Sequence, residues 1–358
     1  MTAFNQVDPI LQSDKVHPED FEFELPEEKI AQYPAEPRDS AKMLVLDRRK
    51  GDAVETVFSD LTEYLGEGDV LVVNNTRVFP AKFQAVKVDN GDPIDIFLIR
   101  ELNPTTWEAI VDPARKVRIG NSIRFSDEVE CDVIDNTVSS GRVLRFIGDG
   151  DVIRERLSEI GHAPLPPYIT RKVEEEDKER YQTVYAKEKG SVVAPSAGLH
   201  LTESLLKKLE SQGVEIVEIT LHLGLEAYKP ITISDLSKYN MQGERFHINP
   251  EAVQRLNAAK KRGNRIIAVG ASTVRALEST QYQGEIVVQQ ENWTDLFVYP
   301  PYHFQMIDGL ITNFQQPRSA TIILQRAFYY KKGLLDIYNK AIQGNYRFLS
   351  FGDAMLII

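Results

Sequence analysis

The chain has 358 residues, of which 42% are hydrophobic and 27% charged, and its formal net charge is −11. This composition is typical of a globular protein of about two domains. The negative net charge excludes a general polyanion-binding protein. A nucleic acid would have to bind at a local basic patch.

The sequence carries no signal for membrane insertion, secretion or disulfide formation. No run approaches the ~20 apolar residues that a membrane helix needs, so no membrane partner is expected. The first residues lack the basic-then-apolar order of a signal peptide. The single Cys131 excludes an internal disulfide framework and a cysteine-rich zinc site. A cytoplasmic location is therefore predicted.

Residues 1–20 are predicted to be a polar N-terminal tail. A hairpin is expected next, in which MLVLD and AVETVF flank the turn Arg48–Gly51. Ser59 is predicted to cap a short helix that Gly66 closes. The apolar run DVLVVN (69–74) predicts a buried strand.

Between Phe79 and about residue 149, short alternating segments recur, separated by Gly, Asn and Asp. Regular short strands with turn signals are typical of a small barrel or sandwich. We therefore predict an inserted β-barrel domain at 79–149, with a main domain formed by 21–78 and 150–358. After this segment a helix is predicted at DVIRERLSEIG, and the pattern of alternating helices and strands resumes.

The stretch Ser191–Gly224 predicts strand, loop, helix and strand. Val192-Val193-Ala194 is the first expected strand, and Pro195 ends it. Thr202 can cap the helix, Gly213 can end it, and 214–221 alternates as a second strand. This order favours a βαβ unit with a right-handed crossover.

Similar signals continue to the C-terminus. A helix is predicted from Asn249-Pro250 to Arg262 with Gly263 as its stop, followed by the strand RIIAV and a helix opened by Gly270. Further strands are expected at 294–299 and 310–312, and further helices at 319–331 and LLDIYNKAIQ. The predicted fold class is α/β, a sandwich-type main domain with an inserted small β-barrel.

Several common motifs are absent. The sequence has no GxxxxGK[ST] loop and no GxGxxG after a strand, which disfavours nucleotide triphosphatases and standard dinucleotide enzymes. Ser196 lies in PSAGL without the flanking glycines of a hydrolase elbow. Composition and spacing alone lead only to an enzyme-like α/β protein.

Eight collinear segments resemble one known family. They include APSAGLHLTESLL, EITLHLGL, AVGASTVRALES, LITNFQQPRS and YRFLSFGDAML, and the resemblance covers about Phe21 to Ile358. The chain resembles the S-adenosylmethionine:tRNA ribosyltransferase-isomerases of queuosine biosynthesis.

The resemblance implies a specific activity. The family attaches the ribosyl part of S-adenosylmethionine to an aminomethyl-deazaguanine base at the tRNA wobble position, and adenine and methionine leave. tRNA and S-adenosylmethionine are therefore the expected partners, and S-adenosylmethionine is a consumed substrate. No metal and no bound cofactor are expected.

His200 and His222 are the candidate general bases. The sulfonium acidifies the carbon beside it, so a base with a pKa near neutral suits the first step. Both histidines follow predicted strands, where open α/β sheets bind ligands. The alternative is that either ring only hydrogen-bonds a neighbouring loop. Two histidines fall short of the three protein ligands that a catalytic zinc usually has.

Charged residues on the family-like segments supply further candidates. Arg275 and Glu278 lie three apart on one predicted helix face, so a surface ion pair is the simple alternative. The resemblance makes Arg275 a candidate anchor for the methionine carboxylate or an RNA phosphate, with Glu278 beside it. Glu244 could orient a histidine or act as an acid or base, or it could be an ordinary exposed glutamate.

Polar residues near predicted strand ends complete the set. Asn75 and Arg77 follow a buried strand at the barrel junction, and a structural turn is their alternative role. Ser196 lies in the turn before His200. Asn313 and Arg318 bracket a polar loop that could line the site or cap the helix at Ser319. All five are candidate substrate-binding residues.

Small basic clusters could meet tRNA, or could be ordinary surface charge. They are Arg115, Lys116 and Arg118; Arg171 and Lys172; and Lys260, Lys261 and Arg262. If RNA binds there, its affinity should fall steeply with salt.

Some positions depart from the family pattern. Gln315 stands where the family usually has histidine, and Glu226-Ala227-Tyr228 replaces a Gly-Thr-Phe run. Asn75 stands where aspartate is common. These departures leave open a diverged paralogue that binds a nucleoside or RNA without this chemistry. A structural or scaffold protein on the same fold is a third alternative.

Overall fold

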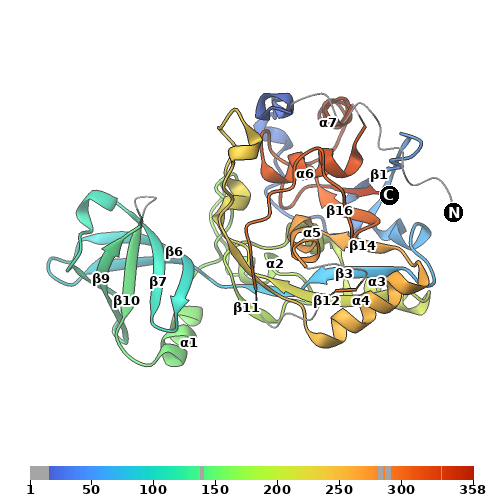
Figure 1. Ribbon diagram of the computed structural model, residues 1–358. Coiled ribbons are helices and arrows are strands. Elements are labelled where there is room, and N and C mark those ends of the chain that lie inside the picture. Colours follow the sequence, from blue (N-terminus) through green and yellow to red (C-terminus); the bar gives the residue numbers. More distant parts are fainter. Residues whose placement is uncertain (1–15, 138–140, 281–284, 287–291, 332) are drawn as a thin grey trace.

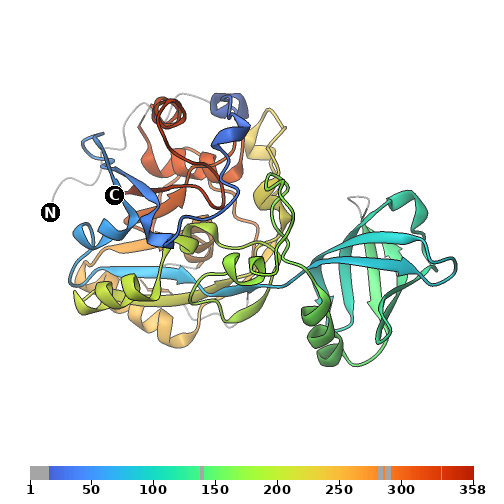
Figure 2. The ribbon, with the colours of Figure 1, turned by 180° about the vertical axis from the view of Figure 1, so that it is seen from behind.

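The computed structural model describes residues 16–358 except 138–140, 281–284, 287–291 and 332, and at 226–227 it describes the backbone only. Figure 1 shows a large α/β part and, to one side of it, a barrel that is joined to it by the chain segments before β5 (Lys82–Lys87) and after α1 (Gly150–Ile160). The reverse view in Figure 2 shows the same separation. The predicted fold class, an α/β main part with an inserted β-barrel, is confirmed.

The main part is organised around one mixed sheet. Its strands are β1 Lys42–Leu46, β2 Ala53–Val57, β3 Val70–Asn74, β12 Glu215–Leu221, β13 Glu244–His247, β14 Ile266–Val269, β15 Asn292–Thr294, β16 Gly309–Asn313 and β17 Ala354–Ile357. In the described part of the chain their order is β15-β13-β12-β3-β14-β16-β17-β1-β2. β12, β3, β14 and β16 run parallel, and antiparallel strands flank them.

β3 lies inside this sheet and is buried on both faces. Val70 and Val72 pack into the core on one face, and Leu71 and Val73 into the core on the other. A strand that is covered on both faces exposes no side chains to solvent, which explains why the sequence of β3 is apolar at successive positions. The predicted buried strand at 69–74 is therefore confirmed.

Helices cover both faces of the sheet. The α-helices of the main part are α2 Asp177–Arg180, α3 Glu203–Ser211, α4 Pro250–Arg262, α5 Ala271–Glu278, α6 Ala320–Tyr329 and α7 Leu334–Gln343. Short 3-10 turns lie at Pro18–Phe21, Glu27–Lys29, Arg38–Ser40, Phe58–Glu63, Ala114–Lys116, Ser196–His200, Leu225–Tyr228 and Leu236–Lys238.

The predicted helix signals act as expected in two helices. Thr202 accepts a hydrogen bond from the Leu205 amide, and Asn249 accepts one from the Ala252 amide. Gly263 takes a left-handed conformation with φ 76° after α4, which a glycine adopts without strain. The helix predicted at Ser59 is instead the 3-10 turn Phe58–Glu63, which Val57 precedes.

The barrel is formed by six consecutive strands. They are β5 Lys82–Lys87, β6 Pro93–Asn103, β7 Thr106–Asp112, β8 Ser122–Ser126, β9 Val129–Asn136 and β10 Arg142–Phe146. Within the described residues they close in the order β10-β7-β6-β5-β8-β9, and α1 Gly150–Ile160 follows. The domain limits at 79 and 149 stay predictions, and most of the expected tail at 1–20 lies outside the described residues.

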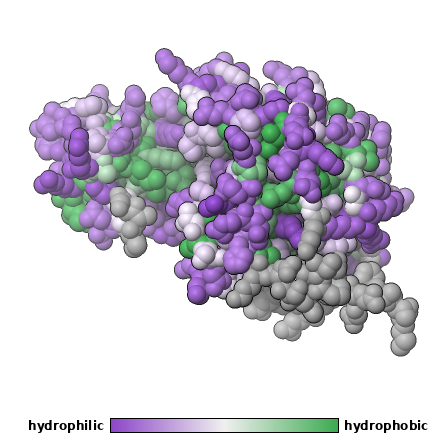
Figure 3. All heavy atoms as spheres, turned by 90° about the horizontal axis from the view of Figure 1, so that it is seen from above, coloured by the Kyte–Doolittle hydropathy of each residue, from purple (hydrophilic) through white to green (hydrophobic). Residues whose placement is uncertain are grey.

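Alternating strands place one set of side chains inside the barrel and the other on its surface. Ile94, Ile96 and Leu98 of β6 lie in its core, whereas Ile110 is 46% exposed. The view from above in Figure 3 shows hydrophobic residues at the surface of the barrel and, among hydrophilic ones, on the main part.

The predicted βαβ unit in one sheet is wrong. Val192-Val193-Ala194 is not a strand; the preceding segment, β11 Glu188–Ser191, pairs with β4 Thr76–Val78 in a separate two-stranded sheet. The parallel neighbour of β12 is β3. The Ser191 hydroxyl donates to the Val193 carbonyl at 2.7 Å, and the two valines pack into the barrel core. This packing draws the apolar run away from the main sheet.

The strand predicted at 294–299 is also wrong, because β15 ends at Thr294. Arg275 donates to the carbonyls of Thr294 and Leu296, at 3.2 and 2.9 Å. The Arg275 side chain thus occupies carbonyl acceptors that the amides of a neighbouring strand would otherwise bind. No local signal indicates this end of the strand, since the arginine is about twenty residues away in the chain.

Candidate active site

A pocket opens at the carboxyl ends of the parallel strands, and we call it the strand-end pocket. Gly270 follows β14, Thr312 lies near the end of β16, and Leu223 follows β12. The pocket encloses about 610 Å³ with its open mouth. Its other lining residues are Tyr168, Val193, Ala194, Pro195, Ser196, Ala197, Tyr228, Ala271, Ser272, Gln315, Gln316, Thr321, Leu349 and Ser350.

The described lining of this pocket contains hydroxyls, amides and apolar groups but no charged side chain. The first residues of α5, Ala271 and Ser272, bring helix N-terminal amides to it. Such amides attract a carboxylate or phosphate without a formal charge. The pocket therefore suits a ligand that carries its own charges.

His222 follows β12 directly and precedes the lining residue Leu223. Its Nδ1 lies 2.8 Å from the Thr76 hydroxyl. A Cβ on Gly190 would lie only 2.9 Å from its Cε1, so β11 passes close over the ring. Burial, and to a smaller extent the charge of Arg245, lower the pKa of His222 to about 4.

His200 lies deeper in the main part. It ends the 3-10 turn Ser196–His200, is 5% exposed, and its ring lies 4.9 Å from that of Phe58. Its Nε2 has no hydrogen-bond partner among the described residues. Burial lowers the pKa of His200 to about 4, and the nearby Asn313 side chain opposes this shift.

We expect His200 to make the fold acid-sensitive. A histidine in the unfolded chain titrates near pH 6.5, whereas the folded His200 titrates near 4. Between these values the unfolded state binds the extra proton, so the free energy of unfolding falls as pH drops through this window, by about 3 kcal/mol. His200→Gln should flatten this dependence in urea unfolding at pH 7 and pH 4.5.

The exposed His303 supplies the control for that measurement. His303→Gln should keep the wild-type pH dependence. An unchanged slope in His200→Gln would contradict the assignment. His222 contributes with the same sign, because its pKa is also lowered.

Glu244 and Arg275 form a buried ion pair, with side chains 6% and 7% exposed. The other oxygen of Glu244 accepts the Gly224 amide at 2.7 Å. The alternative that Glu244 is an ordinary exposed glutamate is therefore wrong. The pair connects β13, α5 and the loop after β12, which carries His222 and Leu223.

The surface ion pair between Arg275 and Glu278 does not form. Glu278 instead accepts the backbone amides of Gln305 and Met306, at 3.0 and 2.9 Å. Burial raises the pKa of its carboxyl. Glu278 thus fixes the segment before β16, away from the strand-end pocket.

Asn75 lies at the end of β3 and bridges two elements. It donates to Glu218 at 3.1 Å and accepts the Thr220 hydroxyl at 2.7 Å. Its neighbour Asn74, which we did not single out from the sequence, donates to Ser272 at 3.1 Å and to the Leu221 carbonyl at 2.9 Å. These amides hold β3, β12 and α5 together beside the strand-end pocket.

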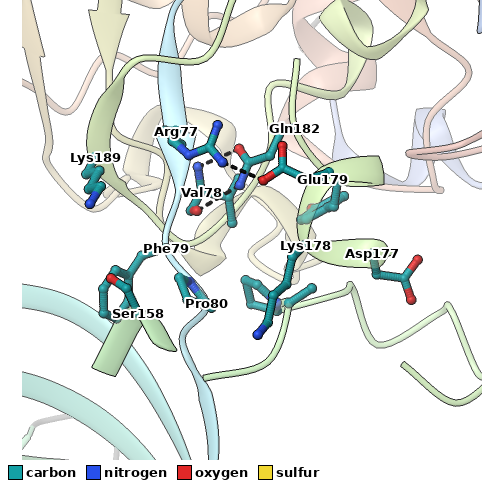
Figure 4. Close-up of a pocket in the computed structure, with 13 residues that line it drawn as sticks. Arg77, Val78, Phe79, Pro80, Ser158, Asp177, Lys178, Glu179, Gln182 and Lys189 are labelled. Atoms are coloured by element: carbon teal, nitrogen blue, oxygen red, sulfur yellow. Dashed lines mark hydrogen bonds and ion pairs between the residues drawn. The ribbon is translucent and has the colours of Figure 1, made fainter. Parts of the chain in front are cut away.

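Arg77 lies in a second pocket, which we call the junction pocket because it lies where the chain enters the barrel (Figure 4). Its guanidinium is 2.6 Å from Glu179, and Lys178 and Lys189 also line the pocket. Tyr181 lines the junction pocket and Tyr228 the strand-end pocket, and their hydroxyls hydrogen-bond to each other. This tyrosine pair lies between the two pockets.

Asn313 and Arg318 lie at opposite ends of the loop after β16. Asn313 is fully buried and donates to the Leu349 carbonyl at 2.8 Å. Arg318 pairs with Glu22, and Ser319 caps α6. Between them, Gln315 and Gln316 line the strand-end pocket.

The structure brings only part of the predicted set to one place. Of the ten candidates, Ser196 lines the strand-end pocket and Arg77 the junction pocket. His222 and Asn313 are each next in sequence to a lining residue of the strand-end pocket. Ser272, Thr312, Tyr168, Tyr228 and Ser350 were missed. All but Tyr228 lie on family-like segments, and all are neutral, so charge and histidine content could not single them out.

Two general properties concern the part of the chain that is described. It contains no group of three His, Cys, Asp or Glu side chains arranged to hold a metal ion. None of its helices combines the length and apolarity that crossing a membrane requires.

Comparison with known proteins identifies the class. Residues 18–357 match the family described as "Queuosine biosynthesis protein". The chain is 46% identical to the S-adenosylmethionine:tRNA ribosyltransferase-isomerase of Flavobacterium psychrophilum over 344 residues, which cover 94% of this chain and 99% of the relative. The enzyme of that name from Chloroherpeton thalassium is also 46% identical, with the same coverage.

A solved structure agrees with these relatives. The crystal structure of the S-adenosylmethionine tRNA ribosyltransferase from Thermotoga maritima is 33% identical, with a TM-score of 0.54. The match covers 95% of this chain and all of that one. The chain belongs to the queuosine biosynthesis protein family.

Proposed function

We propose that this protein is an S-adenosylmethionine:tRNA ribosyltransferase-isomerase. It transfers and isomerises the ribosyl moiety of S-adenosylmethionine onto the aminomethyl-deazaguanine base at the tRNA wobble position. Epoxyqueuosine-tRNA forms, and adenine and methionine leave. The observation that carries the proposal is the neutral pocket at the strand ends, in a chain 46% identical to enzymes of this name.

S-adenosylmethionine occupies the strand-end pocket in this proposal. Its carboxylate lies at the N-terminus of α5, where the Ala271 and Ser272 amides are available. Its sulfonium is not repelled there, since the described lining residues carry no charge. It is a substrate that is consumed, and the reaction proceeds without a metal or a bound cofactor.

His222 is the general base in this proposal. It adjoins a pocket residue and is partly accessible, whereas His200 is buried against Phe58. Deprotonation beside the sulfonium needs a neutral imidazole, and the lowered pKa keeps His222 in that form at neutral pH. A pKa of about 4 lies below the near-neutral value expected from the sequence, because burial disfavours the charged ring, and it makes His222 a weaker base. Glu244, Arg275, Asn75 and Asn313 hold the surrounding loops.

The tRNA approaches from the junction pocket in this proposal. An everted base must reach the nucleoside, and the tyrosine pair Tyr181–Tyr228 lies between the two pockets. Aromatic side chains are suited to stack such a base. Lys189 lines the junction pocket and is available for a phosphate on the outer side, and Arg77 could meet one only by leaving Glu179. A cytoplasmic location, where tRNA is modified, belongs to the same proposal.

The test is turnover. The purified chain is incubated with S-adenosylmethionine and a tRNA that carries the aminomethyl-deazaguanine base, and adenine release is followed by chromatography. Adenine should appear together with a modified tRNA of higher mass, and tRNA with unmodified guanine should give neither. Binding of S-adenosylmethionine without adenine release would instead favour the diverged paralogue.

A further inference from the structure

Three side chains form a row across the edge of the main sheet. Arg245 of β13 is paired directly with Trp293 of β15, and the His222 amide donates to the Arg245 carbonyl at 3.0 Å. Directly opposed residues of antiparallel strands project from the same face. His222, Arg245 and Trp293 therefore share one face, and β15 is the outermost strand of the described sheet.

Trp293 is the more exposed of the two tryptophans. It is 56% exposed, whereas the only other one, Trp107, is 3% exposed and stacks on Phe79. Its Cε3 would lie 3.6 Å from a Cβ at Gly243, in ordinary contact, so one part of the indole rests against the protein. Much of the remaining ring is open to a ligand.

Arg245 is exposed, and among the described residues its side chain has no ion-pair or hydrogen-bond partner. Most other arginines of the main part are paired; Arg171 and Arg265, for example, bind Asp177 and Asp69. An uncompensated cation beside an exposed aromatic is notable in a chain of net charge −11. β11 passes close to the His222 ring at Gly190, where an added Cβ would lie 2.9 Å from Cε1, and the neighbouring Lys189 lines the junction pocket.

We propose that Trp293 and Arg245 form a stacking platform for single-stranded RNA beside the reacting nucleotide. An unpaired base stacks on the indole, and an adjoining phosphate pairs with the Arg245 guanidinium. The proposal rests on the proposed function, because it assigns this surface to the tRNA that the site would modify.

Charge and chemistry select RNA as the occupant. Binding of single-stranded nucleic acid combines aromatic faces with cations that follow the backbone. A single indole with a neighbouring arginine provides both, whereas an interface between protein copies needs a broad apolar area. The platform is also continuous with His222, which lies beside the strand-end pocket.

The first test uses the fluorescence of the protein. Since Trp107 is buried, exposed-tryptophan emission reports on Trp293. An anticodon stem–loop RNA carrying the aminomethyl-deazaguanine base should quench this emission as it saturates the protein. In Trp293→Phe the RNA-dependent change should vanish while binding, followed by anisotropy of a labelled RNA, persists.

The second test measures affinity in variants. Trp293→Ala should weaken RNA binding by about 5- to 150-fold, the loss expected for one stacked base, and Trp293→Phe should restore most of it. Arg245→Gln should weaken binding and reduce the slope of log affinity against log salt by about 1. Lys340→Gln, a change at an exposed lysine of α7, is the matched control and should alter neither.

The outcomes separate this inference from the proposed function. Equal RNA affinity in the wild type and Trp293→Ala, or no quenching in the wild type, overturns the platform even if adenine release is normal. Loss of self-association in Trp293→Ala with unchanged RNA affinity overturns it in favour of an interface between copies. S-adenosylmethionine affinity should stay unchanged in both variants. Quenching with normal RNA binding but no turnover supports the platform and contradicts the proposed reaction.

Discussion

Replacing His222 by alanine is expected to lower kcat for adenine release by about 10²- to 10⁴-fold, the usual contribution of a general base. S-adenosylmethionine affinity should change little, because His222 precedes the pocket lining and does not belong to it. Single-turnover kinetics with modified tRNA and calorimetry with S-adenosylmethionine measure the two effects. His303→Ala, at an exposed histidine, is the control. An unchanged kcat would remove His222 from the mechanism.

The pH dependence of the wild type adds a second check on His222. A base works when it is deprotonated, so kcat/KM should rise with pH through about 4 and be flat at neutral pH. Part of the lowering of its pKa comes from Arg245. A phosphate bound to Arg245 would offset that charge, so the midpoint for kcat, which reports the bound complex, should lie above the midpoint for kcat/KM.

Replacing Glu244 by alanine is expected to lower the free energy of unfolding by about 3–5 kcal/mol. The change leaves Arg275 buried and charged without its partner, and the lost charge pairing is the larger part of the cost. It also leaves the Gly224 amide without its acceptor. Urea unfolding measures the loss.

Two further variants show whether the charge is the cause. Replacing Glu244 by leucine and Arg275 by methionine together should recover much of the stability, because no buried charge remains. Glu130→Ala breaks the exposed pair with Arg124 in the barrel and should cost at most about 1 kcal/mol. Wild-type stability in Glu244→Ala would show that Arg275 does not depend on this carboxylate.

Strong local signals in the sequence were enough for many elements of the fold. Several elements form where they were predicted: the alternating strands of the barrel, the buried strand at 69–74, and helix α4 with its Asn249 cap and Gly263 stop. These signals depend on near neighbours in the chain. Where distant residues compete, prediction failed, as when the barrel core took Val192 and Val193 and Arg275 took the carbonyls after β15.

For the site, the sequence singled out histidines, charged residues and the neutral Asn75, Ser196 and Asn313, and the fold gives several of them supporting positions. The sequence left three roles open for Glu244: orienting a histidine, acting as an acid or base, or lying exposed at the surface. Its partner Arg275 lies 31 positions away on another element. No local pattern encodes such a distance. The neutral hydroxyls of the strand-end pocket were missed for the same reason, since Ser272, Thr312 and Ser350 are ordinary residues until the sheet brings them together.

The sequence by itself determined the fold class and, through its family-like segments, the expected chemistry, because periodicity, caps and motifs are written in consecutive residues. Only the tertiary structure decided which charges neutralise each other and which remain free. It buries Glu244 with Arg275 and leaves Arg245 exposed beside Trp293. Pairing and burial depend on strand order and register, which join residues that the chain keeps apart.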